Sequence, residues 1–169
     1  RFKTESIKSN SLTYNAIYSI LSDREDNIWI GSYFGGVDYL VKRNSWFMHD
    51  YANGKPGAFN ARIPRSIVEA EGGLVWIATE DNGIFIYDMQ NHVFTPFTGI
   101  PTLGSNVHSL YYDPVSRDMW IGSRFNGLFR YQLGTHQYSQ YYYTNGMRSA
   151  GIFDVCKTSN GRIWVATMD

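Results

Sequence analysis

The chain has 169 residues, and its 15 Lys and Arg balance its 15 Asp and Glu, so it lacks the basic excess typical of nucleic-acid-binding regions. Hydrophobic residues make up 43% and aromatic residues 17%, enough to bury a core and too many for a disordered chain. No apolar run approaches the ~20 residues that span a bilayer, and the one cysteine, Cys156, excludes an intrachain disulfide. We therefore expect a folded module that contacts neither nucleic acid nor the membrane directly.

The first predicted strand is the apolar run AIYSIL (16–21), which is followed by a polar turn and then by the strand IWIGS (28–32). This order of apolar run, turn and tryptophan strand returns three times along the chain. The four tryptophans are spaced 47, 44 and 44 residues apart, and a fixed spacing of this kind indicates a structural repeat. The later copies of the second strand are VWIAT (75–79), MWIGS (119–123) and IWVAT (163–167).

The repeat extends well beyond the tryptophan. A glycine stands seven residues after each of the first three tryptophans, and an aromatic residue stands eighteen residues after it. The segments are short, rich in β-branched and aromatic residues, and show no sustained helical period. Four strands in about 44 residues are typical of one blade of a β-propeller. The repeat residues are Trp29, Trp76, Trp120, Trp164, Gly36, Gly83, Gly127, Phe47, Phe94 and Tyr138.

We predict an all-β chain, a partial β-propeller over residues 1–169 with about three and a half four-stranded blades and no helix longer than about two turns. An outer strand near Phe2, three complete blades and two strands of a fourth are expected. Trp29 and its three equivalents are predicted to be buried between blades, and the Gly or Ala two residues later to lie where backbones crowd together. Asp23 and Asp113 are predicted to accept hydrogen bonds from the turn backbone. Because unpaired edges recruit strands, we expect the open arc to pair with the remaining blades of a parent propeller or with a second copy of itself.

Recognised catalytic and metal-binding motifs are absent from the sequence, so we expect no catalytic residue, no metal and no cofactor. The patterns G-x-S-x-G, H-E-x-x-H and the P-loop do not occur, and the histidines lack the spacing of metal ligands. His92 and His136 each follow a blade tryptophan by sixteen residues, which favours a structural role. Cys156 lies in an apolar inner-strand segment, where a buried and inert thiol is expected.

The loops are the stronger candidates for ligand binding. Propellers usually bind ligands on the face where the loops between second and third strands and the connections between blades emerge. Aromatic rings beside Asn, Asp and Arg suit sugars, which stack on rings and need directional polar partners. The alternative is that Tyr33, Phe34 and Phe125 pack against neighbouring blades. The candidate ligand-binding residues are Tyr33, Phe34, Asp81, Asn82, Arg124, Phe125 and Arg148.

The pattern I-x-S-I-L-x-D…N-I-W-I-G-S-x-x-x-G in the first copy, together with its three later copies, resembles two-component regulator propeller repeats. The second copy departs from this pattern, with Ala70 at the Asp position. The resemblance implies a periplasmic, extracytoplasmic sensor region of a hybrid two-component system of the Bacteroides type. It also implies tandem seven-bladed propellers, an oligosaccharide ligand, and signalling to transcription through a cytoplasmic histidine kinase.

Two other functions remain open at this stage. A propeller enzyme of the antibiotic-lyase type carries a similar D-G-x-(I/L)-W pattern, but it places acid and base residues on one loop face. Here Glu80 is the one Glu or His in such a loop. A protein-interaction scaffold overlaps with the sensor function. We therefore expect this chain to be a non-catalytic sensor module.

Overall fold

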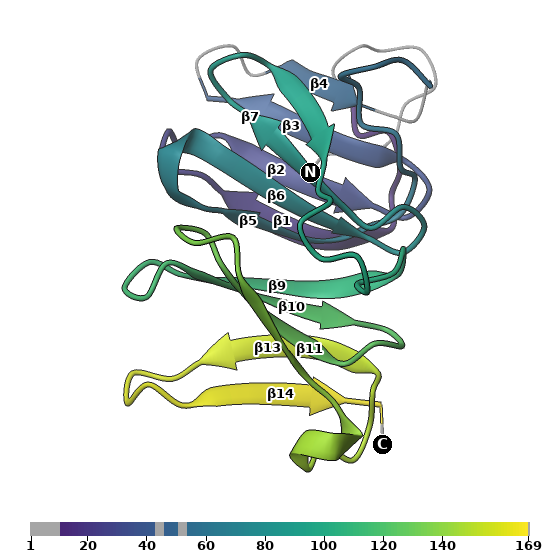
Figure 1. Ribbon diagram of the computed structural model, residues 1–169. Coiled ribbons are helices and arrows are strands. Elements are labelled where there is room, and N and C mark those ends of the chain that lie inside the picture. Colours follow the sequence, from purple (N-terminus) through teal and green to yellow (C-terminus); the bar gives the residue numbers. More distant parts are fainter. Residues whose placement is uncertain (1–10, 43–45, 51–53, 169) are drawn as a thin grey trace.

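The computed structural model describes residues 11–42, 46–50 and 54–168, and these residues form four antiparallel sheets (Figure 1). The first sheet contains β1 (Ile17–Ser22), β2 (Ile28–Ser32), β3 (Gly36–Val41) and β4 (Trp46–Asp50). The second contains β5 (Pro64–Glu69), β6 (Leu74–Thr79), β7 (Ile84–Asp88) and β8 (Val93–Pro96). The third contains β9 (Val107–Asp113), β10 (Asp118–Ser123), β11 (Leu128–Gln132) and β12 (Tyr138–Tyr141), and the fourth contains β13 (Ile152–Lys157) and β14 (Ile163–Thr167).

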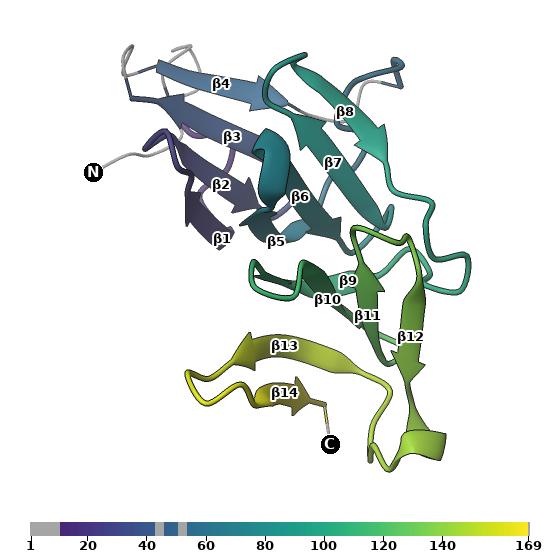
Figure 2. The same ribbon diagram turned by 60° about the vertical axis from the view of Figure 1, so that its left-hand side comes forward.

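Each sheet is a meander in which consecutive strands pair, and the sheets fan out around one side of the molecule (Figure 2). The strands β1, β5, β9 and β13 lie next to one another on the inner side, and β4, β8 and β12 lie at the periphery. Helical structure in the described residues is limited to two 3₁₀ turns, η1 (Glu71–Gly73) and η2 (Tyr143–Asn145). The prediction of an all-β partial propeller with three full blades and two further strands is confirmed. The strand expected near Phe2 lies outside the described residues.

The tryptophans fill the wedges between adjacent sheets. Trp29 stacks on Tyr39 of its own sheet, with ring centroids 4.8 Å apart, and meets Tyr87 of the next sheet edge-on at 5.2 Å. Trp76 meets Tyr131 of the third sheet at 6.2 Å between ring centroids, with the two rings tilted by 49°. Both tryptophans are almost completely buried, at 1% and 3% exposure. Each is therefore covered by the third strand of the sheet that follows it.

The prediction that all four tryptophans are buried is wrong for Trp120 and Trp164. Trp120 is half-buried and Trp164 is 59% exposed. The fourth sheet has two strands in this chain, so Trp120 has no third strand of a following sheet against it, and Trp164 has no following sheet. Cys156 pairs with Trp164 in the ladder and is exposed for the same reason, so the expected buried thiol is also wrong.

The small residue two positions after the tryptophan lies where two sheets approach each other. A Cβ atom at Gly31 would lie 2.5 Å from Ser19 Oγ and 3.2 Å from Pro64 of the next sheet. At Gly122 it would lie 2.4 Å from Ser109 Oγ and 2.6 Å from Ile152 of the next sheet. These distances are shorter than van der Waals contact, so the predicted crowding of the inner strands is confirmed. The loop glycines Gly36, Gly83 and Gly127 have φ of 76°, 71° and 81°, which favours glycine.

The turn between the first two strands of a sheet is organised by an aspartate. Asp23 Oδ1 accepts hydrogen bonds from the backbone N–H groups of Glu25 and Asn27, and Asp23 Oδ2 accepts one from Trp29 Nε1 at 2.9 Å. Asp113 likewise accepts a bond from the Val115 N–H, so both predicted turns are confirmed. The second sheet has Ala70 at this position.

Without an aspartate at this position, the second sheet contains a buried N–H donor that is unpaired. Ala70 has no side-chain acceptor, and the buried Trp76 Nε1 has no hydrogen-bond partner among the described residues. An unpaired buried N–H costs about 1–3 kcal/mol. The fold of the second sheet is nevertheless the same as that of the first, because its apolar packing is retained.

His92 and His136 lie at equivalent turn positions, with φ of 55° and 57°. The Nδ1 atom of each ring lies 2.9 Å from a tyrosine hydroxyl of the preceding strand, that of Tyr87 or Tyr131. The same hydrogen bond therefore closes the turn between the third and fourth strands in two sheets. The predicted structural equivalence of the two histidines is confirmed.

We expect Trp76→Ala to lower the free energy of unfolding of the 169-residue chain by about 3–5 kcal/mol, because it removes a buried ring from the wedge between two sheets. Trp164→Ala is the matched control. Its ring is 59% exposed, so its removal should change the free energy by about 0.5 kcal/mol or less. Urea denaturation followed by circular dichroism measures both values, and equal losses in the two variants would contradict the assignment of Trp76 to the wedge.

We also expect the isolated chain to associate in solution. Trp164 of the fourth sheet is 59% exposed, and Ile20 of the first sheet is 68% exposed. Exposed apolar surface and open sheet edges favour pairing with another copy. Light scattering coupled to size-exclusion chromatography should give a mass above 19.4 kDa. A stable monomer at micromolar concentration would refute this prediction.

Candidate functional site

The inner strand of every sheet contains a β-bulge at the same place. The ladder between first and second strands skips one residue in each sheet, between Ile17 and Ser19 in the first and between Pro64 and Ser66 in the second. The third and fourth sheets skip a residue at the corresponding positions. Bulges are frequent beside functional sites because they redirect a side chain out of the regular alternation of a strand. The four bulged residues are Tyr18, Arg65, His108 and Phe153.

These bulged residues lie beside the residues that directly follow the second strands. Together they form one continuous group on the inner side of the fan, which we name the inner-strand cluster. Its members are the bulged residues Tyr18, Arg65, His108 and Phe153 and the loop residues Tyr33, Glu80 and Arg124. The four bulged residues also line a common cavity of about 380 Å³, with Ser66, Ser109 and Asp154.

Arg65 links the first and second sheets in this cluster. Its guanidinium carbon lies 4.3 Å from the centroid of the Tyr18 ring, within the range of a cation–π interaction. Its Nη1 atom lies 3.1 Å from Glu80 Oε1. Tyr18 in turn meets Tyr33 at 5.4 Å between ring centroids. A charged group is thus held between an aromatic ring and a carboxylate.

His108 links the second and third sheets. Its Nε2 atom lies 3.6 Å from Glu80 Oε1, and its ring centroid lies 5.4 Å from that of Phe153. Burial, followed by the positive charges of Arg65 and Arg124, lowers the pKa of His108 to about 4. Its Nδ1 atom is buried and has no hydrogen-bond partner in the described part of the chain. The imidazole is therefore neutral at pH 7 and has a free polar atom.

Two of the residues predicted from sequence belong to the cluster, and two flank it. Tyr33 contacts Tyr18, and the guanidinium carbon of Arg124 lies 5.9 Å from the centroid of the Phe153 ring. Phe34 and Phe125 follow them directly and are 51% and 62% exposed. Both rings stand at the rim of the cluster, where a ligand can reach them.

Asp81 and Asn82 lie on the same loop face and are engaged with the connection that enters the second sheet. The Asp81 carboxylate accepts hydrogen bonds from the backbone N–H groups of Arg62 and Ile63. Asn82 Nδ2 donates to the carbonyl of Asn60 at 2.7 Å. These bonds give both side chains a role in fixing the connection between the first two sheets.

Arg148 lies away from the other six predicted residues. It lines a separate cavity of about 390 Å³ together with Trp120, Tyr141 and Ile163, between the third and fourth sheets. The structure therefore does not bring Arg148 into the inner-strand cluster.

Five residues of the cluster are not among the ligand-binding residues predicted from the sequence: Tyr18, Arg65, His108, Phe153 and Glu80. A signal for the first four was present, since each precedes its blade tryptophan by eleven or twelve residues. These residues lie within apolar runs that predict regular strands, so the pattern does not single them out. Only the bulges show that these side chains leave the alternation of the strand.

A second polar group, Thr13, Asp38 and His49, lies in the first sheet. The buried Asp38 carboxylate accepts hydrogen bonds from the Thr13 N–H and hydroxyl, and His49 Nδ1 lies 2.6 Å from Asp38 Oδ1. Thr13 Oγ1 and His49 meet the same carboxylate oxygen, so the imidazole does not bridge hydroxyl and carboxylate as in a catalytic triad. This group ties the segment before β1 to β3 and β4.

Two segments of the chain match the family model described as "Two component regulator propeller", over residues 11–34 and 146–169. The first segment contains β1 and β2, and the second contains β13 and β14, so each covers an inner strand, its bulge and a tryptophan strand. These segments are two-component regulator propeller repeats. No curated protein sequence matches the chain significantly.

Solved structures confirm the propeller fold. One, described as the extracellular domain of a hybrid two-component system from B. thetaiotaomicron, superposes with a TM-score of 0.82 at 19% identity, covering 98% of this chain and 23% of that one. A second such domain from the same species gives 0.78 at 18% identity, with 97% and 23% coverage. PorZ, a surface component of the type-IX secretion system of Porphyromonas gingivalis, gives 0.71 at 15% identity, with 99% and 27% coverage. The chain thus spans about a quarter of the length of these structures.

The lowered pKa of His108 predicts a pH dependence of stability. Between pH 6.5 and 4 the unfolded chain binds a proton at this residue that the folded chain does not, so the free energy of unfolding should decrease as the pH falls through this range. We expect His108→Gln to remove this contribution, because glutamine does not titrate.

Denaturation of the unsubstituted chain and of His108→Gln at several pH values between 7 and 4 measures how the free energy of unfolding of each depends on pH. The charged neighbours Arg65, Glu80 and Arg124 are present in both proteins, so their titration does not distinguish them. Parallel curves for the two chains would contradict the buried, neutral imidazole.

Proposed function

We propose that the chain is part of the extracytoplasmic, periplasmic sensor region of a hybrid two-component system, and that its inner-strand cluster contacts an oligosaccharide. The single observation that carries the ligand part is the repeated bulge, which presents Tyr18, Arg65, His108 and Phe153 side by side. The two-component regulator propeller repeats support the sensor part.

The cluster has the composition that suits a sugar ligand. The rings of Tyr18 and Phe153 are 44% and 40% exposed, which leaves ring surface for stacking against the C–H face of a sugar. Arg65 and Glu80 offer directional hydrogen bonds beside these rings. Pockets that combine apolar surface with a few fixed polar groups are typical of small-ligand sites.

The sensor would be larger than this chain. The chain spans about 23% of the matched extracellular domains, so we infer that further blades of a parent propeller complete the ring and extend the cluster. Ligand binding in such a region would signal to transcription through a kinase outside these residues. We propose a binding role without turnover for the cluster, since its one histidine is held neutral and its one carboxylate is paired with Arg65.

Calorimetry of the complete sensor region against a panel of oligosaccharides tests this proposal. We expect at least one glycan to bind, and we expect Tyr18→Ala, Arg124→Ala and Phe125→Ala each to weaken it by about tenfold or more, because each removes a stacking or polar contact. The thermal midpoint should change little, since substitutions at exposed positions are usually worth about 0.5 kcal/mol or less.

Val115→Ala is the control. This residue is 88% exposed and lies in the turn between β9 and β10, at the opposite end of the inner strand from the loop residue Arg124, so it should leave the affinity unchanged. Unchanged affinity in Tyr18→Ala, Arg124→Ala and Phe125→Ala alike would remove the cluster and its rim from the site. Product formation from any glycan would overturn the non-enzymatic role.

A further inference from the structure

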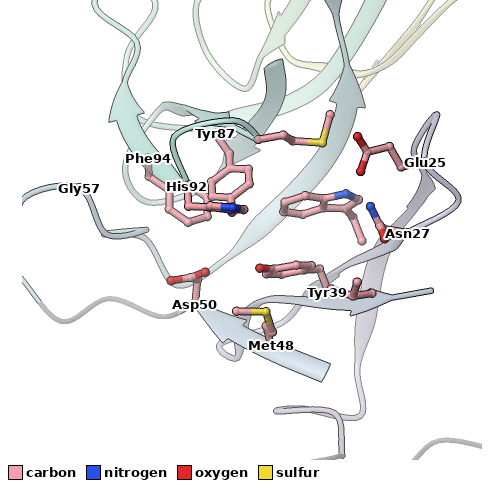
Figure 3. A pocket seen from close by; sticks show the side chains of 12 residues that line it. Glu25, Asn27, Tyr39, Met48, Asp50, Gly57, Tyr87, His92 and Phe94 are labelled. Atoms are coloured by element: carbon pink, nitrogen blue, oxygen red, sulfur yellow. The ribbon is translucent and has the colours of Figure 1, made fainter. Parts of the chain in front are cut away.

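A cavity of about 560 Å³ opens between the first and second sheets (Figure 3). It lies between β3 and β4 of one sheet and β7 and β8 of the next, and it shares no residue with the inner-strand cluster. Its volume falls within the range of small-molecule sites. Both of its walls belong to the described chain, so the site does not depend on further blades.

The first sheet departs from the repeat at positions that line this cavity. Twenty-one residues after the tryptophan, the second and third sheets carry Phe97 and Tyr141, whereas the first carries Asp50. The strand pairing confirms that Asp50 and Phe97 are equivalent. Val37 pairs with Asp50, and the Phe97 N–H donates to the carbonyl of Ile84, which is the residue equivalent to Val37.

Phe97 shows what normally occupies this space. Its ring lies 4.9 Å from that of Trp76 and 5.0 Å from that of Tyr131, and it therefore fills the wedge between the second and third sheets. In the wedge between the first and second sheets, a short carboxylate stands at this position, and the Tyr39 ring stacks on Trp29 at 4.8 Å. The space that an aromatic side chain fills elsewhere is left between Trp29, Tyr39 and Tyr87.

The cavity is aromatic on its walls and negative in charge. Asp50 and Glu25 both line it, and its lining residues in the described part of the chain include no Lys or Arg. Lys42 lines the neighbouring groove and is paired with Asp26. Figure 3 shows Asp50 and Glu25 on opposite sides of the aromatic side chains.

The Asp50 carboxylate has no side-chain hydrogen-bond partner among the described residues. Burial raises its pKa, against a smaller opposing effect of His49. Burial chiefly, and the charge of Asp50 in addition, raise the pKa of Tyr39 and of Tyr87. A positive group beside Asp50 would offset this unfavourable charge.

We propose that this cavity binds a small organic cation, an amine with a flat apolar portion, whose ammonium group pairs with Asp50. The apolar portion lies among Tyr39, Tyr87 and the thioether of Met89, which line the cavity. Aromatic rings together with a carboxylate are the usual surroundings of bound ammonium groups, because the ring faces carry partial negative charge. This site is independent of the proposed glycan site.

The test uses phenethylamine and its uncharged isostere 2-phenylethanol, titrated calorimetrically into the 169-residue chain near pH 7. We expect the amine to bind about tenfold or more tightly than the alcohol. Asp50→Asn should abolish this preference, because it removes the charge and keeps the shape. Arg124→Ala, a substitution in the inner-strand cluster, should leave amine binding unchanged.

Asp50→Phe is the decisive variant. It restores the residue type of the other two sheets, so it should fill the cavity, eliminate binding of both probes and raise the thermal midpoint. The proposal is overturned if neither probe binds, if amine and alcohol bind equally, or if Asp50→Phe retains the amine affinity. Loss of glycan binding in Asp50→Phe would contradict the independence of the two sites.

Discussion

The arc of sheets depends on one contact, in which the third strand of a sheet covers the tryptophan of the sheet before it. Antiparallel sheets are apolar on both faces only when another sheet lies on each side. Here the tryptophan ring of one sheet packs against an aromatic ring of the next. Trp29 and Trp76 have this cover and are buried, whereas Trp120 and Trp164 lack it and are partly or largely exposed. The gradient along the chain shows that burial is a property of the pair of sheets and not of the sequence IWIGS or IWVAT.

The close approach of the inner strands follows from the same contact. Filling the wedge with a ring brings the inner strands together, so that Gly31 and Gly122 have no room for a side chain. The bulges place one residue per sheet, Tyr18, Arg65, His108 or Phe153, on this crowded inner side. Rigid sheets thus hold a row of variable side chains at fixed spacing, which is how a repeated fold accommodates a specific site.

Departures from the repeat carry most of the functional information. Ala70 leaves Trp76 Nε1 without its acceptor, and the fold tolerates this because the apolar packing remains. Asp50 in place of an aromatic residue opens a cavity and leaves a poorly stabilised carboxylate beside it. A position that breaks a local rule without a structural gain is the place to look for a ligand.

The sequence by itself determined the fold class, the number of complete sheets and the turn aspartates, because these depend on local patterns that recur every 44 to 47 residues. It also identified Tyr33 and Arg124, which stand directly after a recognisable strand. Tertiary structure alone decided which tryptophans are buried, since their cover comes from a strand roughly 55 residues further along the chain, as with Trp29 and Tyr87. It alone brought His108 to Glu80, because a bulge shifts the direction of a side chain without leaving a mark in the hydrophobic pattern. It alone separated Arg148 from the cluster, because the path of the connection before β13 places this residue beside Trp120 and Ile163.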